Sequence, residues 1–532
     1  MRIIVPLQGV VQGRGGVFWG SVIPCGLFYL LQLYIRQRRP SSSEDGDSET
    51  GPVVPPSEGT ISRTSSNNDV DSANNEESAN SLSVLHLKSP KKHPPFVSKR
   101  AIAASDKGDS PYYIGWTEYY RDPYHATENP HGVIQLGLAE NTLSLNLLQD
   151  WMKQHPEASL WNEGEQLSLM DVAPYQYSHG MPALKSDREG GRSSRVCALS
   201  SFLENLLERS PHFKAENVVL TAGATAALEI LGFCLGEAGD AFLVPSPYYP
   251  GFDRDFKWRS GIQLVPVYCP SSKGFTITRT ALEKAYTQAQ RQGITIRAIV
   301  ITTPGNPVGN ILDADTICSV FNFAKAKGIH VISDEIYAAS VFRGKFVSAS
   351  QILATGNYDS SFVHIVYGLS KDFGIPGFRV GLLYTTNEKI LAAAQNFTRF
   401  CTVSSHTQRL LLYLLQDKDF IEMFLQENRR RLCNRYDAVL EGLQSAGINC
   451  AESSGGLYCW LDLRHLLAST MPEAENSLWK KLLYEVKVNL TPGSACHYPE
   501  AGWFRLCFAN VDGQTLNAAL KRLHVFTEGM RK

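Results

Sequence analysis

Between residues 217 and 385, short and almost wholly apolar runs alternate with segments that have the period of an amphipathic helix. The runs are Asn217–Gly223, Asp240–Pro247, Arg297–Pro304, His330–Glu335, Phe362–Ser370 and Val380–Thr385. Continuous apolar runs separated by helices are typical of a mostly parallel sheet covered on both faces. We therefore expect an α/β fold in which ligands bind at the carboxyl ends of the strands.

The N-terminus has a different character. Residues 17–35 contain no charged side chain and are followed by Arg36, Arg38 and Arg39. A helix needs about 20 apolar residues to cross a bilayer, so we interpret residues 17–35 as a transmembrane anchor that leaves the catalytic part facing the cytosol. A buried helix kinked at Pro24, a removed signal peptide and a cytoplasmic protein without an anchor remain alternatives.

The rest of the chain divides by composition. Residues 1–39 form the N-terminal segment, and residues 40–105 are an acidic, Ser-rich stretch that cannot bury enough apolar surface to fold. Residues 106–532 are rich in apolar and aromatic side chains and exceed the usual size of one core. We predict a catalytic region there, with a large domain of about 150–390 and a smaller α/β domain. The smaller domain is formed by residues 106–149 and 391–532.

Charge and cysteine content argue against two classes of site. The net charge of −1 provides no general attraction for nucleic acid. The eleven cysteines show neither a C-x-x-C pair nor a zinc spacing, so we interpret them as reduced thiols and expect no metal site.

Reactive and small side chains stand where the predicted strands end. The first strand ends in Gly223-Ala224-Thr225 and leads into a helix, whose free N–H groups would bind an anion, although tight strand–helix packing explains the same residues. Asp334 and Tyr337 follow a later strand, and Ser370-Lys371 follows another. A lysine at the end of a buried strand is expected to be desolvated, paired or covalently used.

These residues lie in a series of longer motifs. In chain order they are YYIGWTEYYRDPY, QLGLAENTLSLNLLQDW, VVLTAGATAALEIL, FLVPSPYYPGFDRD, TTPGNPVGN, SDEIYA, LSKDFGIPGFRVG and GWFRLCFAN. The series resembles the fold-type I enzymes that depend on pyridoxal 5'-phosphate (PLP). Within them it is most similar to the plant 1-aminocyclopropane-1-carboxylate (ACC) synthases and their divergent, aminotransferase-like branch. The resemblance implies a seven-stranded, mostly parallel sheet, bound PLP and a homodimer.

The same resemblance implies a role for each motif residue. Lys371 would form the Schiff base and move the Cα proton. The cofactor-binding residues would be Gly223, Ala224, Thr225, Tyr249, Asn306, Asp334, Tyr337, Ser370, Lys371 and Arg379. Arg505 would hold the substrate α-carboxylate, and Glu140 would lie on the substrate side.

The sequence departs from the family at three places. Gly368 replaces a serine three residues before the lysine, and Ser178 replaces the tyrosine of a D-Y-H-G motif. Residues 186–198 are a polar insertion, which is either a surface loop or an artefact of a gene model. The serine at 178 favours an aminotransferase acting on α-amino acids and a 2-oxo acid. ACC synthase is the alternative, and a membrane-tethered pseudoenzyme is a third reading.

Overall fold

The computed structural model describes residues 97–98, 101–102, 105, 110–158, 173, 178–181, 184, 198–206 and 213–531. The chain divides into two units, Met1–Lys92 and His93–Lys532, and every described residue belongs to the second. The predicted anchor at 17–35, most of the predicted linker and residues 186–197 of the insertion therefore lie outside the described residues. No helix in the described part of the chain is long and apolar enough to span a membrane.

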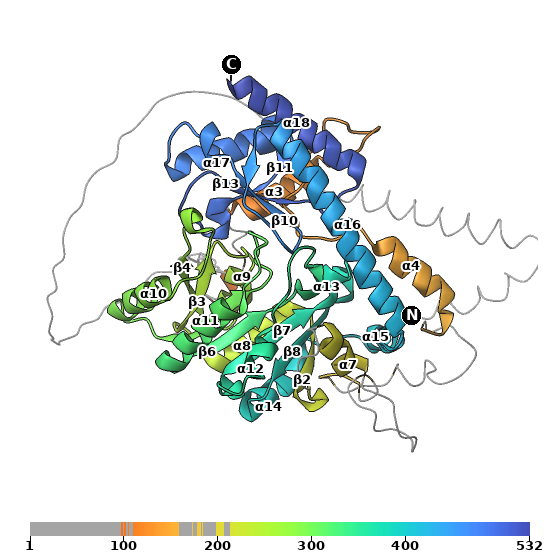
Figure 1. Ribbon diagram of the computed structural model, residues 1–532, viewed down its shortest axis with the longest axis vertical. Helices are drawn as coiled ribbons and strands as arrows, with labels where there is room; N and C mark the ends of the chain where they lie inside the picture. Colours follow the sequence, from red (N-terminus) through yellow and green to blue (C-terminus); the bar gives the residue numbers. More distant parts are fainter. Residues whose placement is uncertain are drawn as a thin grey trace, which may run out of the picture. The chain divides into compact units, whose positions relative to one another are not determined.

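A seven-stranded sheet with the order β2-β8-β7-β6-β5-β3-β4 forms the centre of the fold (Figure 1). The strands are β2 (Val218–Ala222), β3 (Ala241–Ser246), β4 (Gln263–Tyr268), β5 (Ile296–Thr302), β6 (His330–Asp334), β7 (Val363–Gly368) and β8 (Val380–Thr385). Only β8 runs against its neighbours, so the predicted mostly parallel sheet is confirmed. The sequence analysis did not identify β4, a partly exposed edge strand that contains Pro266.

Helices cover both faces of this sheet. They are α7 (Ala198–Leu206), α8 (Ala224–Leu235), α9 (Phe252–Lys257), α10 (Arg279–Arg291), α11 (Ala314–Lys327), α12 (Ala349–Leu353), α13 (Leu369–Asp372), α14 (Glu388–Phe397) and α15 (Ser405–Gln416). One apolar core joins the sheet to α7, α10, α11, α12 and α15, and the other joins it to α8, α9 and α14. Helices α14 and α15 therefore pack against the large sheet, although they extend beyond residue 390. The domain boundaries that the sequence suggests, 150–390 for the large domain and 106–149 with 391–532 for the small one, stay a prediction.

A second, smaller layer lies above this sheet in Figure 1. Its antiparallel sheet has the order β12-β13-β10-β9 and is accompanied by a short parallel pair, β1 with β11. The elements are α3 (Pro111–Arg121), β1 (Ile134–Gln135), α16 (Lys418–Ser445), β9 (Asn449–Cys450), β10 (Tyr458–Asp462), α17 (Pro472–Lys480), β11 (Val488–Asn489), β12 (Thr491–Pro492), β13 (Trp503–Cys507) and α18 (Gly513–Arg531). Helix α4 (Leu145–Gln154) instead contributes Leu148 and Trp151 to the core of the large sheet.

The long helix α16 connects the two layers. Near its start, Phe424 stacks on Phe373 beside the large sheet, with ring centres 5.1 Å apart. Further along, Leu432, Tyr436 and Val439 belong to the core of the small layer. One rigid helix therefore holds the two sheets against each other, and the segments that end between them can form a shared site.

Candidate active site

Glycines bring the start of α8 close to the ends of β7 and β8. Gly223 has φ +86°, and a Cβ there would lie 2.7 Å from Nη2 of Arg379. A Cβ on Gly381 would lie 2.4 Å from the amide nitrogen of Ala224. The first N–H groups of a helix have no partner within it, and together with the helix dipole they attract anions. The exposed Arg379 beside them makes this helix end a suitable phosphate site, with Thr225 on its exposed side.

Asp334 ends β6 in the buried interior, with 5% of its surface exposed. Burial raises the pKa of its carboxyl to about 7, the nearby Glu335 carboxylate adds to this, and the Lys371 ammonium opposes it. A carboxylate in such a place is stabilised by a cation at hydrogen-bonding distance. Asp334 is therefore placed to pair with a protonated ring nitrogen.

Lys371 lies just beyond β7, where its ammonium nitrogen Nζ donates a hydrogen bond to the carbonyl oxygen of Ala139 at 2.6 Å. Burial lowers the pKa of this amine to about 8, even though the Glu140 carboxylate favours its charged form. A larger share of the amine is thus unprotonated near neutral pH than for a free lysine, as covalent use requires. Ser370, directly before it, is also buried.

Arg505 comes from β13 in the small layer and is fully buried. It donates from Nη1 to Oδ1 of Asn306 at 2.8 Å and from Nη2 to the carbonyl oxygen of Gly137 at 2.7 Å. Its guanidinium also lies over the ring of Tyr458, 4.8 Å from the ring centre. Asn306 links this arginine to Tyr337, because its Nδ2 is 3.4 Å from the Tyr337 hydroxyl.

The structure distinguishes the two tyrosines of the PYYP sequence. Tyr248 stacks on His497 and belongs to the apolar core, with ring centres 4.5 Å apart. Tyr249 instead meets the ring of Phe252 edge-on and lies next to Tyr112. Tyr249 is therefore the one placed to cover a bound ring.

Three residues that the sequence analysis missed also belong to this site. Tyr112 and Tyr458 flank the Arg505 guanidinium. Asp255 is the third residue. Burial raises the pKa of its carboxyl to about 7, and the nearby carboxylates of Asp334 and Glu229 add to this rise, while the Arg379 guanidinium opposes it. The FDRD motif was a visible signal for Asp255, whereas Tyr458 lies inside an apolar strand and carries no local signal.

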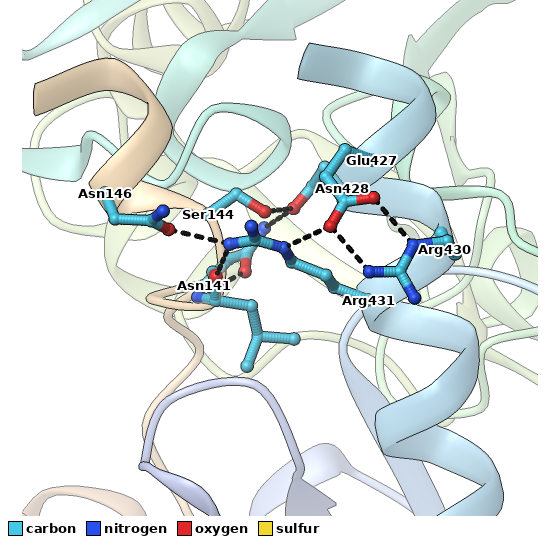
Figure 2. Close-up of polar contacts among 8 residues, drawn as sticks. Asn141, Ser144, Asn146, Glu427, Asn428, Arg430 and Arg431 are labelled. Atoms are coloured by element: carbon cyan, nitrogen blue, oxygen red, sulfur yellow. Dashed lines mark hydrogen bonds and ion pairs between the residues drawn. The ribbon is translucent and has the colours of Figure 1, made fainter. Parts of the chain in front are cut away.

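A polar network fixes the loop that carries Glu140 (Figure 2). The next residue, Asn141, donates from Nδ2 to the Lys371 carbonyl oxygen at 3.2 Å and to Oδ1 of Asn428 at 3.0 Å. Asn428 is fully buried on α16 and donates to the carbonyl oxygen of Asp372 at 3.2 Å. Arg431, one turn further on, donates to the carbonyl oxygen of Leu143. The Glu140 loop and the Lys371 segment are thus held by the same helix.

Ser178 contacts Thr398, the residue that directly follows α14. The two hydroxyl oxygens are 3.1 Å apart, and the fully buried Thr398 donates its own proton to the Gln395 carbonyl oxygen at 2.6 Å, so Ser178 is the donor to Thr398. The preceding Tyr177, which the sequence offered as a replacement for the missing tyrosine, lies outside the described residues.

Comparison with known proteins places the chain in a family. The family model for aminotransferase class I and II matches residues 133–523. The chain belongs to this family. It is therefore a PLP-dependent enzyme of the aminotransferase class and acts on small molecules.

Three curated plant relatives are similar over most of the chain. The probable aminotransferase ACS12 of Arabidopsis thaliana is 43% identical over the full length of both proteins. The 1-aminocyclopropane-1-carboxylate synthase 6 of Oryza sativa subsp. japonica is 44% identical, covering 99% of this chain and 93% of its own. The 1-aminocyclopropane-1-carboxylate synthase CMA101 of Cucurbita maxima is 47% identical, covering 82% and 90%.

Solved structures agree on the fold. An aspartate aminotransferase from Thermus thermophilus with maleate superposes with a TM-score of 0.63 at 19% identity, covering 81% of this chain and 100% of that one. An aromatic aminotransferase from Pyrococcus horikoshii OT3 gives a TM-score of 0.61 at 20% identity, covering 75% and 96%. The expected fold type I is confirmed.

The described residues fit PLP. The cradle between Gly223 and Gly381 has no room for side chains but presents the free N–H groups that a phosphate needs. The buried Asp334 suits a pyridinium nitrogen, and the desolvated Lys371 amine suits the cofactor aldehyde.

Proposed function

We propose that this protein transfers the amino group of an α-amino acid to a 2-oxo acid. The observation that carries the choice is Ser178, a short hydroxyl paired with Thr398 at the position where the ACC synthases have an active-site tyrosine. Amino transfer needs only a proton moved between the substrate Cα and the cofactor, which one amine can do. Ring closure of S-adenosylmethionine also needs its sulfonium group held in line, a demand on orientation that a serine meets poorly.

Bound PLP supplies an electron sink for the bond that breaks at the substrate Cα. Lys371 holds the cofactor and then moves the Cα proton with its unprotonated amine. Asp334 keeps the ring nitrogen protonated, and Tyr337 with Asn306 holds the ring oxygen. Tyr249 covers the ring face.

The ends of the substrate–cofactor pair are held by charge. Arg379, with Ser370 and the first N–H groups of α8 at Ala224 and Thr225, holds the phosphate. Arg505 binds the substrate α-carboxylate from the opposite layer, and its hydrogen bonds to Asn306 and Gly137 preorganise it. Glu140 faces the substrate next to Lys371. This machinery argues against the pseudoenzyme reading.

ACC synthase is the second candidate, and the named relatives favour it over amino transfer. Two of the three relatives described above carry ACC synthase names, at 44% and 47% identity. Glu140 and the residues that would hold the cofactor serve either reaction. The two activities therefore have to be separated by experiment at the groups that face the substrate side chain.

The test is a substrate panel with the full-length protein, purified in mild detergent and loaded with PLP. We expect α-amino acids with 2-oxoglutarate to give glutamate and the matching 2-oxo acid in equal amounts, and S-adenosylmethionine to give little ACC. Ser178→Tyr should raise ACC formation, while the matched Ser178→Ala should not. Efficient ACC formation by the unchanged protein would overturn the proposal in favour of the second candidate. A variant lacking residues 186–198 controls for an effect of the insertion.

Assembly and location are part of the same proposal. We propose a homodimer, to be checked by light scattering of the purified protein, with a monomer as the contrary result. We further propose that residues 17–35, with the arginines that follow them, anchor the chain in a membrane with the enzyme on the cytosolic side. A reporter fused after residue 39 should then sediment with membranes, and recovery in the supernatant would favour the cytoplasmic alternative.

A further inference from the structure

Two tyrosine hydroxyls face each other in the buried part of the site. The oxygens of Tyr337 and Tyr458 are 2.5 Å apart, and the two side chains are 2% and 0% exposed. Nδ2 of Asn306 lies 3.4 Å from the first oxygen and 3.3 Å from the second. Tyr337 has a place in the proposed function as a ligand of the ring oxygen, but Tyr458, on β10, has none so far.

Arg505 fixes which way the Asn306 amide points. A guanidinium carries only donors, so the Asn306 atom that meets Nη1 of Arg505 at 2.8 Å must be the amide oxygen. The amide nitrogen then faces the two tyrosines and donates toward both oxygens. Neither hydroxyl can therefore donate its own proton to Asn306.

The proton of Tyr458 has one acceptor among the contacts of the described residues, the oxygen of Tyr337. The guanidinium of Arg505, which lies over the Tyr458 ring, accepts nothing. A buried hydroxyl without an acceptor loses roughly 1 kcal/mol or more. With the ring oxygen of bound PLP as the acceptor for Tyr337, as the proposed function has it, both protons find an acceptor only when Tyr458 donates to Tyr337.

We propose that Tyr458 is a positioning residue, which donates to Tyr337 and so directs the Tyr337 proton to the ring oxygen of bound PLP. The positive charge of Arg505 over its ring strengthens this donor. Tyr458 also couples the two ends of the site, because the arginine that would bind the substrate carboxylate contacts the same tyrosine. The inference rests on the proposed role of Tyr337 and deepens it.

The test uses the visible absorbance of the PLP-loaded full-length protein, titrated with acid and base without substrate. The Tyr337 proton stabilises negative charge on the ring oxygen most strongly when the neighbouring lysine-linked nitrogen has lost its proton. A weaker hydrogen bond from Tyr337 therefore favours the protonated nitrogen. It raises the midpoint of the titration, which is the pH at which half of this nitrogen has lost its proton. We expect a rise of roughly one pH unit in Tyr337→Phe and about half of that in Tyr458→Phe.

The double variant and a control make the test decisive. The variant with both substitutions should have the midpoint of Tyr337→Phe alone, because Tyr458 acts only through Tyr337. Tyr436→Phe removes a hydroxyl that accepts from the Ser453 amide within the small layer, and it should leave the midpoint unchanged. An unchanged midpoint in Tyr458→Phe, or shifts that add in the double variant, would overturn the inference.

The same data separate this inference from the assignments on which it rests. A shift in Tyr337→Phe without one in Tyr458→Phe supports the role of Tyr337 and rejects that of Tyr458. No shift in Tyr337→Phe rejects both. Amino transfer itself is read from the product assay, so its absence leaves the spectroscopic outcome intact. Tyrosine and phenylalanine fill almost the same volume, and thermal unfolding of each variant confirms that the fold is retained.

Discussion

The two halves of the site are built in different ways. The half that would hold the cofactor stands on the strand ends of one sheet: Asp334 after β6, Lys371 after β7 and the α8 N-terminus after β2. The half that would hold the substrate gathers side chains from distant segments. Arg505 lies 199 residues from its partner Asn306, and Asn141 lies 287 residues from Asn428. The first half depends on local sequence, and the second on how the two layers meet.

This difference predicts where substitutions act. A change in the cofactor half should alter the visible spectrum and turnover together, since the sheet that supports it is rigid and buried. A change in the substrate half should alter the Michaelis constant and leave the bound cofactor in place. The variants below test that division, from the largest effect to the smallest.

Lys371→Ala removes the amine that would hold PLP and move the Cα proton. We expect turnover to fall by roughly 10³-fold or more, with loss of the visible band that the lysine-linked cofactor gives. Steady-state assays and absorbance spectra in excess PLP measure both. Lys327→Ala is the control, because that lysine pairs with Glu283 on the surface of the large layer. A Lys371→Ala protein with turnover within tenfold of the original would contradict the assignment.

Asp334→Asn keeps the shape of the side chain and removes its charge. Turnover should fall by roughly 10²-fold, as expected when one preorganised electrostatic partner is lost. Glu335→Gln is the matched control. This adjacent carboxylate is also fully buried, but it accepts from the Ser348 hydroxyl and the Ala349 amide on the other face of the strand. Glu335→Gln should lower the thermal stability and leave the cofactor spectrum unchanged. Equal spectra in Asp334→Asn and Glu335→Gln would contradict the pairing of Asp334 with the ring nitrogen.

Arg505→Lys keeps a positive charge but loses the planar fork that would hold a carboxylate. The ratio kcat/KM for the amino donor should fall by roughly 10-fold to 100-fold, mostly through KM. The cofactor spectrum should persist. Arg522→Lys, on α18, tests the general cost of such a change, since Arg522 donates to the Gly132 and Lys487 carbonyl oxygens away from the site. Loss of the visible band in Arg505→Lys would show that the two halves are not separable.

The same contrast explains what the sequence could predict. The strands that end at Asp334 and shortly before Lys371 are apolar runs, so the fold and the position of these two residues at strand ends follow from the local pattern, while their roles stay a prediction. The edge strand β4 was missed because its residues are half-exposed and include Pro266. Tyr458 was missed because its role depends on Tyr337, 121 residues earlier in the chain. A contact of that kind is fixed by tertiary packing and leaves no spacing to detect.

The smallest effect is expected at Gly368, the one departure from the family inside the cofactor half. Gly368 has φ −172°, an extended conformation open to any residue. An added Cβ would lie 3.7 Å from the Ala224 amide nitrogen, so a serine hydroxyl there could reach the phosphate cradle. The same Cβ would lie 3.0 Å from the Val380 carbonyl oxygen, a close contact that requires a small shift of the backbone. The gain of a hydrogen bond to a charged group and the cost of crowding oppose each other.

We expect the hydrogen bond to exceed the cost of crowding by about 1 kcal/mol, which makes PLP bind roughly fivefold more tightly to Gly368→Ser. Gly368→Ala carries the same Cβ without the hydroxyl, so it isolates the crowding and should bind PLP no better than the original. Dissociation constants from absorbance titrations of the cofactor-free proteins measure the difference. Equal affinities for the serine and alanine variants would mean that position 368 does not face the phosphate, and the cradle would then consist of the α8 N-terminus and Arg379 without it.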